Sequence, residues 1–160
     1  MRPRAQHHDA NAHARRANAK QAGTLCPESR LLLAAASIGL AALLSIARTL
    51  EPNPLGRGTH LQLGLPQCAF EVLFGHPCPA CGMTTAWAHV ARGDAVAGLR
   101  ANISGAVAAL LAIAAVPWWL ACAATGRWLL WSVSDRAAIL VTLTLVLVAL
   151  AQWGWRLLAG

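Results

Sequence analysis

Hydrophobic residues fall into three long runs without charge, separated by polar or turn-rich segments. The runs cover residues 31–47, 103–124 and 137–155. Each is close to the length that crosses a bilayer core of about 30 Å at 1.5 Å per residue. Flanking residues as far as Leu50 complete the first run, beside the long side chain of Arg48. The pattern therefore predicts three transmembrane helices, over about 31–50, 103–124 and 137–155.

The segment before the first run has a different character from the rest of the chain. Residues 1–30 are polar and basic and contain no apolar run. Such a segment cannot bury enough surface to offset the entropy lost on ordering, so it predicts a disordered tail. Residues 31–160 are then a single membrane domain.

Between the first and second runs lies a segment that is apolar in part but too short to span. Residues 61–75 are interrupted by Pro66 and carry a charge at Glu71. This length suits a piece that lies at the interface or re-enters the membrane. A carboxylate at such a depth needs a partner, and Arg92 or Arg100 is the predicted one.

The segment that follows, to residue 102, predicts two short helices at 84–91 and 95–101, separated by Arg92-Gly93-Asp94. Together these patterns predict an all-α integral membrane protein. It has three transmembrane helices, with an interfacial or re-entrant loop between the first and the second, and its cysteine-bearing segment covers residues 60–102.

The composition also indicates a membrane protein, and the distribution of charge predicts how the chain is oriented in the membrane. Apolar residues make up 57% of the chain and charged residues 12%, well below the roughly 25% of a typical globular protein. Six of the thirteen Lys and Arg residues precede residue 31, which predicts a cytoplasmic N-terminus in contact with anionic lipid. The localisation expected is the cell (inner) membrane of a bacterium. The basic tail contains no aromatic residue, which argues against a nucleic-acid partner.

The cysteine-bearing loop contains the motif Cys78-Pro79-Ala80-Cys81-Gly82-Met83-Thr84-Thr85. Pro79 fixes its own φ, and Gly82 can adopt a positive φ that turns the chain sharply. Thr84 or Thr85 can then cap the next helix by accepting a hydrogen bond from a free N–H group. Such a turn brings Cys78 and Cys81 together. It also directs Cys81 at a helix N-terminus, where a thiolate is favoured.

Three interpretations of the motif remain open. It can be a structural turn of small residues. It can be a metal site, in which Cys68, Cys78 and Cys81 supply three soft ligands to zinc or copper and His60, His76 or His89 supplies a fourth. It can also be a redox pair formed by Cys78 and Cys81, although the βαβ pattern that usually accompanies such pairs is missing.

The five cysteines are an odd number and cannot all pair within one chain. These observations favour a non-enzymatic accessory or binding component of the membrane, with a possible membrane-protein partner. In this reading the turn is structural or metal-binding. The alternative is a membrane thiol-disulfide redox protein that uses Cys78 and Cys81.

The order of these residues resembles a known family. Cys68, the core Gly75-His76-Pro77-Cys78-Pro79-Ala80-Cys81-Gly82-Met83-Thr84-Thr85-Ala86 and the later Gly93 and Asn102 are similar to the small bacterial membrane proteins of domain of unknown function 2752. Many members carry Arg at the position of Thr85 and Pro at the position of Ile103. The resemblance implies the same membrane architecture. The structural residues expected in the motif segment are Pro79, Gly82, Thr84, Thr85 and Asn102. It implies no activity, because none is established for the family.

Overall fold

The computed structural model describes residues 24–129 and 135–159, and this part of the chain is helical. In order along the chain, its elements are α2 (Pro27–Thr49), the 3₁₀ helix η1 (Thr59–Leu63), α3 (Ala69–Phe74), α4 (Met83–Ala91), α5 (Ala95–Ala101), α6 (Ile103–Thr125) and α7 (Asp135–Ala159). No strand forms among these residues beyond an isolated bridge between Thr24 and Arg127. The predicted all-α class is confirmed.

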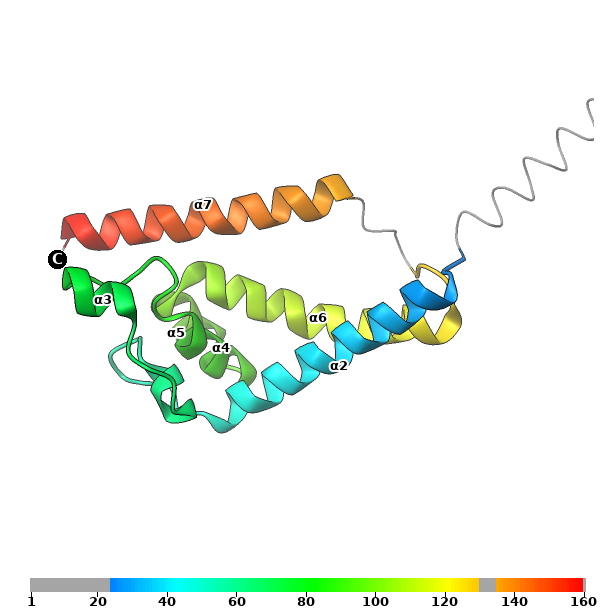
Figure 1. The fold of residues 1–160 in the computed structure, drawn as a ribbon, viewed down its shortest axis with the longest axis horizontal. Coiled ribbons are helices and arrows are strands. Elements are labelled where there is room, and N and C mark those ends of the chain that lie inside the picture. The colour runs from blue at the N-terminus through cyan, green and yellow to red at the C-terminus, as the bar shows by residue number, and fades with distance from the viewer. Residues whose placement is uncertain (1–23, 130–134, 160) are drawn as a thin grey trace, which may run out of the picture.

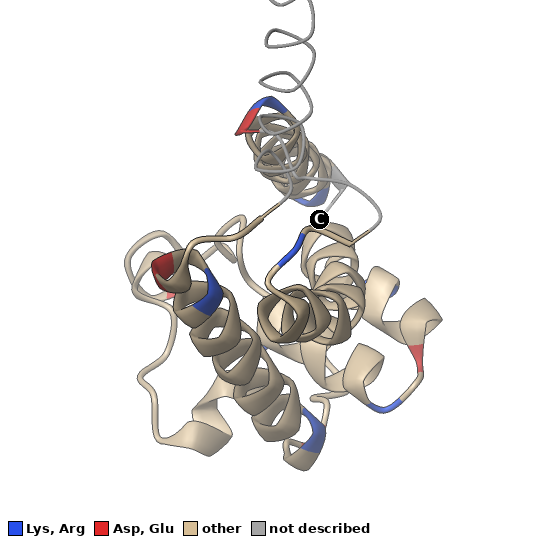
Figure 2. Cartoon of the chain, turned by 90° about the vertical axis from the view of Figure 1, so that its right-hand side faces the viewer, with Lys and Arg blue, Asp and Glu red and all other residues tan. Residues whose placement is uncertain are grey.

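Three of the helices are long and apolar enough to cross a membrane: Pro27–Thr49, Ile103–Thr125 and Asp135–Leu158. They point large hydrophobic side chains outward, as in Leu32 of α2 and Leu147 of α7, which are 70% and 65% exposed. Lipid is the solvent that such surfaces require. Most of the ribbon in Figure 2 carries no charged residue. The predicted arrangement of three spanning helices is therefore confirmed.

The first helix begins four residues before the predicted span. Pro27 opens α2 because its fixed φ suits a first helical position, and Glu28 in the first turn faces the positive end of the helix dipole. Residues 27–30 are thus helical rather than part of the predicted tail. The prediction of disorder for residues 1–23 falls outside the described part of the chain.

The short elements between α2 and α6 gather at one end of the molecule, beside the end of α7 (Figure 1). At the opposite end the start of α2 meets the end of α6. There the backbone N–H of Leu25 donates to Gly126 O at 2.8 Å, and Arg30 Nε donates to Ala123 O at 2.8 Å. Helices α2 and α6 therefore run antiparallel, and the cysteine-bearing loop lies at the end of the bundle away from Thr24.

Small residues form the core where α4, α5 and α6 meet. Ala86, Val90, Ala101, Ala106 and Ala109 are buried together, and Trp87 packs against them. Small side chains let helices approach closely, which is how helices associate in a membrane. Gly98 lies at a close approach of α5 to α4, because a Cβ added there would come within 2.8 Å of a Val90 methyl group. This close packing holds α4 and α5 rigidly against the start of α6.

Helix α7 is anchored to this region through its last turns. Gln152 Oε1 accepts a hydrogen bond from Ile103 N at 2.9 Å, and Trp153 Nε1 donates to Pro77 O at 2.7 Å. The Trp153 ring also meets Phe70 of α3 edge to face, with 5.9 Å between centroids. The third span is therefore attached to the segment that carries the cysteine motif.

Candidate metal centre

The cysteine motif folds as a tight turn that leads directly into α4. The N–H of Cys81 donates to Cys78 O at 3.0 Å, and the N–H of Met83 donates to Ala80 O at 3.1 Å. Gly82 precedes the helix with φ at 90°, a conformation that side chains rarely adopt. The predicted sharp turn at Gly82 is confirmed, and it brings the two cysteines of the motif together.

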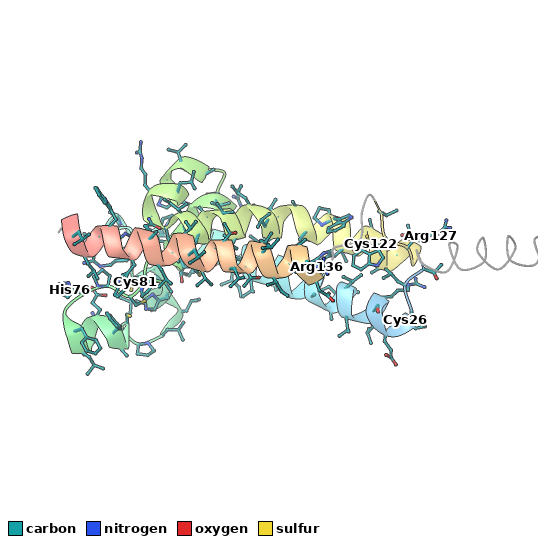
Figure 3. The ribbon with its side chains drawn as sticks, turned by 90° about the horizontal axis from the view of Figure 1, so that it is seen from above. Cys26, His76, Cys81, Cys122, Arg127 and Arg136 are labelled. Carbon is teal, nitrogen blue, oxygen red and sulfur yellow. The ribbon has the colours of Figure 1, made fainter. Side chains whose placement is uncertain are left out.

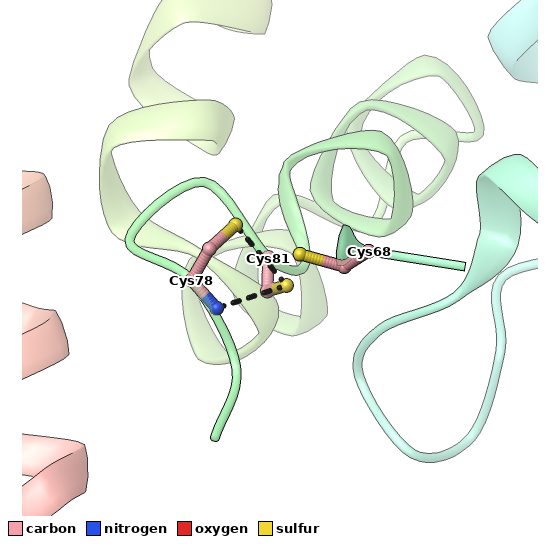
Figure 4. Close-up of side chains that lie close together, drawn as sticks. All are labelled: Cys68, Cys78 and Cys81. Carbon is pink, nitrogen blue, oxygen red and sulfur yellow. Dashed lines mark hydrogen bonds between the residues drawn. The ribbon is translucent and has the colours of Figure 1, made fainter. Parts of the chain in front are cut away.

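Three cysteine sulfurs converge at this turn (Figure 4). The Cys78 thiol donates to Cys81 Sγ at 3.3 Å, and the backbone N–H of Cys78 donates to the same sulfur at 3.2 Å. Cys68 approaches from the start of α3, and the three sulfur atoms all lie within 4.8 Å of one another. The other two cysteines, Cys26 and Cys122, lie towards the opposite end of the molecule (Figure 3).

The three sulfurs lie close to the spacing that one metal ion requires. Zinc lies about 2.3 Å from a thiolate, so its sulfur ligands stand about 3.8–4.0 Å apart. That separation falls between the 3.3 Å of the Cys78–Cys81 pair and the 4.8 Å limit of the group. Shifts of a few tenths of an ångström to about 1 Å would be enough to close the sulfurs around an ion. The residues therefore fit a thiolate-bound zinc or copper(I) ion.

The thiols of Cys68 and Cys81 lie in different environments, which shift their pKa values in opposite directions. The pKa of Cys68 is lowered to about 7, first because the backbone N–H of Glu71 favours its thiolate. The pKa of Cys81 is raised to about 12, first because burial disfavours the charged form and then because of the Cys78 thiol. We predicted a thiolate-favouring site at Cys81, and that prediction is wrong. The desolvation of a side chain that is only 9% exposed outweighs the nearby helix end.

The sulfurs border a pocket with a volume of about 240 Å³. Its wall includes polar side chains of the loop after α2, of η1 and of α3: Arg57, His60 and Glu71. Arg57 Nε forms an ion pair with Glu71 Oε1 at 3.2 Å. Glu71 was expected to pair with Arg92 or Arg100. Arg92 instead donates to Leu50 O, and the loop after α2 supplies Arg57 as the partner of the carboxylate.

None of the described histidines joins the three sulfurs within 4.8 Å. His60 borders the pocket, but its Nε2 lies 3.2 Å from Pro66 O. His76 is exposed at the edge of the molecule (Figure 3). His89 lies in the last turn of α4 and does not line the pocket. The predicted fourth ligand is therefore not brought to the cluster, which offers three protein ligands and an open side.

Asn102 links the cysteine turn to the second span. Its Oδ1 caps α6 by accepting from Gly105 N at 2.8 Å, and its Nδ2 donates to Cys81 O at 3.2 Å. The Cys81 carbonyl also accepts from Arg156 Nη1 of α7 at 3.3 Å. Asn102 is 1% exposed. A buried amide with all its partners fixes the position of the turn.

Thr85 serves a different purpose from the predicted cap. Helix α4 has no side-chain cap, and its N-cap position is Gly82. Thr85 is fully buried, and its hydroxyl shares a 2.8 Å hydrogen bond with the hydroxyl of Thr59. Thr84, the other predicted cap, lines the pocket. Helix α4 begins at Met83, two residues earlier than a cap at Thr84 would require and three earlier than a cap at Thr85, so both threonines lie within the helix. Thr85 therefore joins α4 to η1.

Comparison with known proteins agrees with the resemblance seen in the sequence. Residues 68–116, from Cys68 to the middle of α6, match the family described as Protein of unknown function (DUF2752). No curated protein and no solved structure matches the chain. The matched region contains all three cysteines of the cluster, the turn and Asn102. The predicted family resemblance is confirmed, and the family is uncharacterised.

Proposed function

We propose that this chain is a metal-binding accessory protein of a membrane, in which Cys68, Cys78 and Cys81 hold one thiophilic ion. The observation that carries the proposal is the convergence of three sulfurs from two separate segments within 4.8 Å. Three thiolates suit copper(I) in a trigonal site. They also suit zinc with its fourth position open to water or to a donor from a partner.

A purely structural turn accounts for less of what is seen. The turn itself needs Pro79, Gly82 and the hydrogen bonds within residues 78–83. It does not need Cys68, which lies ten residues before Cys78 and approaches from another helix. A thiol placed there, with its pKa lowered to about 7, supplies a thiolate ligand at neutral pH. Metal binding therefore explains the position of Cys68, while a structural turn does not.

The proposed setting is the inner membrane of a bacterium. The Lys and Arg residues before the first span favour a cytoplasmic N-terminus, with the basic tail on anionic lipid. With three spans, the cysteine-bearing loop then lies on the outer face. The metal site would stand at the membrane surface, where an ion or a partner membrane protein can reach its open side.

Elemental analysis of the purified protein tests this function. The full chain is purified in detergent with reductant, supplied with zinc or copper(I), and desalted. We expect about one ion per chain, lost from Cys68→Ser and from Cys81→Ser. The matched control is Cys26→Ser, because Cys26 is exposed at the far end of α2 and should leave the metal content unchanged. A metal-free wild type, or equal loss in the control, would refute the proposal.

A second candidate is thiol-disulfide exchange, favoured by the 3.3 Å approach of the Cys78 and Cys81 sulfurs. In that reaction the two thiols give up two protons and two electrons and form one S–S bond. A disulfide of a partner protein accepts both electrons and becomes two thiols. Alkylation of cells with and without reductant distinguishes the two functions. A Cys78–Cys81 pair that cycles between forms supports exchange, whereas one that stays reduced rules it out.

A further inference from the structure

A second pocket, separate from the sulfur cluster, is surrounded by arginines. It has a volume of about 190 Å³ and is lined by Leu55, Gly56, Arg57, Pro77, Arg100, Ala101 and Arg156. The three arginines come from the loop after α2, from the last turn of α5 and from the last turns of α7. No acidic residue lines the pocket. Three cations thus border a space that contains no carboxylate.

The protein neutralises these cations only in part. Arg57 is paired with Glu71 at 3.2 Å, from outside the pocket. Arg156 donates to the carbonyls of Cys81 and Ala101, which use two of the five N–H donors of a guanidinium. Arg100 is exposed and forms no hydrogen bond or ion pair within the described part of the chain. Like charges held together in this way require a counter-anion, and the guanidinium group matches the geometry of phosphate.

The pocket also lies at the depth of lipid headgroups. Ala101 is two residues before α6 begins, and Arg156 is in the last turns of α7, so two spans reach the bilayer surface here. Leu55, which lines the pocket, is 76% exposed, and Trp155, which precedes Arg156 in the chain, is 72% exposed. A cavity of about 190 Å³ holds several water molecules and so has room for a phosphate group.

From these observations we propose that the arginine pocket binds a phosphate group, and that an anionic phospholipid of the same leaflet supplies it. The phosphate lies among Arg57, Arg100 and Arg156, while the acyl chains lie along Leu55 and the end of α7. Arg156 then connects the lipid to the cysteine turn, because the same guanidinium donates to the carbonyl of Cys81. The site is additional to the proposed function, and either can be wrong without the other.

The test compares lipid binding by the full chain and by charge variants. Detergent-solubilised protein is titrated with short-chain phosphatidylglycerol or phosphatidylcholine, and tryptophan fluorescence is followed. Arg100→Gln is the test variant, because Arg100 has no structural partner among the described residues. Arg136→Gln is the matched control, since Arg136 lies near the other end of α7 (Figure 3). Removal of one arginine should weaken phosphatidylglycerol binding about five-fold, and Arg100→Lys should restore most of it.

Inorganic phosphate serves as the competitor that identifies the source of the anion. Preference for phosphatidylglycerol that depends on Arg100 and resists millimolar phosphate supports the lipid site. Binding of inorganic phosphate that depends on Arg100, with no preference among lipids, supports a phosphate site filled from solution. Equal binding of both lipids with no binding of phosphate, or equal weakening in Arg100→Gln and Arg136→Gln, would overturn the proposal.

Discussion

At the scale of single residues, Gly82 allows the cysteine turn to form. Glycine suits this position for two reasons: its φ is 90°, and there is no room for a side chain. A Cβ at this position would come within 2.7 Å of the carbonyl oxygens of Ala101 and Gly56. The turn is therefore pressed between the loop after α2 and the end of α5, with no room for a side chain. This contact also explains why the motif places Gly directly after Cys81.

Replacing Gly82 by Ala should therefore destabilise the cysteine loop. The backbone conformation alone costs about 1–3 kcal/mol for a residue with a side chain, and the two carbonyl contacts add to that. We expect a lower unfolding temperature in detergent together with loss of bound metal. Gly39→Ala is the control, because nothing lies within 4 Å of a Cβ there. Equal unfolding temperatures for the two variants would contradict the close packing of the turn.

The reactivity of the thiols provides a second prediction at this scale. A pKa of about 7 leaves much of Cys68 as thiolate near neutral pH, whereas a pKa of about 12 keeps Cys81 protonated. Because the thiolate is the reactive form, iodoacetamide should modify metal-free protein at Cys68 well before Cys81. Mass spectrometry of peptides from timed samples measures the order. Modification of Cys81 at the same rate as Cys68 would disprove the assigned environments, and unfolded protein provides the reference rates.

At the scale of elements, the last turns of α7 hold the cysteine segment. Trp153 contributes a hydrogen bond to Pro77 O, one residue before Cys78, and a ring contact with Phe70 of α3. Helix α3 carries Cys68 at its N-cap position, and Pro77 precedes the motif. One tryptophan therefore touches both segments that supply sulfurs, which couples the third span to the geometry of the cluster.

Trp153→Phe keeps the ring and removes the N–H donor, so it should loosen the cluster without unfolding the helices. We expect metal affinity to fall several-fold, corresponding to the roughly 1 kcal/mol of one hydrogen bond. Competition with a chelator of known affinity measures the change. The exposed Trp155 gives the matched control, Trp155→Phe, which should bind metal as the wild type does. An unchanged affinity in Trp153→Phe would show that α7 does not support the site.

The elements themselves could largely be predicted from the sequence, because lipid imposes a simple rule on them. Uncharged runs of the right length mark the spans, and Arg92-Gly93-Asp94 marks the break between α4 and α5. The contacts between distant segments could not be predicted in the same way. The pairing of Arg57 with Glu71 and the hydrogen bond between Thr59 and Thr85 depend on how the loop folds over α3 and α4.

The candidate site, too, could be predicted from the sequence only in part. The turn residues Pro79 and Gly82 predicted that Cys78 and Cys81 meet, and Cys68 was predicted as a third soft ligand. The raised pKa of Cys81 could not be predicted, because its first cause is the burial of the side chain in the folded chain. The role of Trp153 was also missed. Its position at the end of a run indicates a residue at the membrane surface, and no sequence signal shows its bond to Pro77.

At the scale of the whole molecule, the antiparallel packing of α2 and α6 sets which segments share a side. Thr24 and Arg127 form a bridge at one end, and the cysteine loop lies at the other. If the basic tail is cytoplasmic, the loop is outside. Topology reporters after residue 24 and after Arg127 should therefore report the cytoplasm, and one after Gly58 should report the outside. A reporter after Gly58 on the same side as the other two would contradict three spans.

In the proposed site, three cysteines at the membrane surface share one metal ion. X-ray absorption at the zinc or copper edge of the purified full chain tests it most directly, because the first coordination shell reports both the ligand type and the distance. We expect about three sulfur neighbours at roughly 2.3 Å, and no such first shell in Cys68→Ser, which should lose the ion. A first shell made only of nitrogen and oxygen, or a spectrum unchanged in Cys68→Ser, would contradict it.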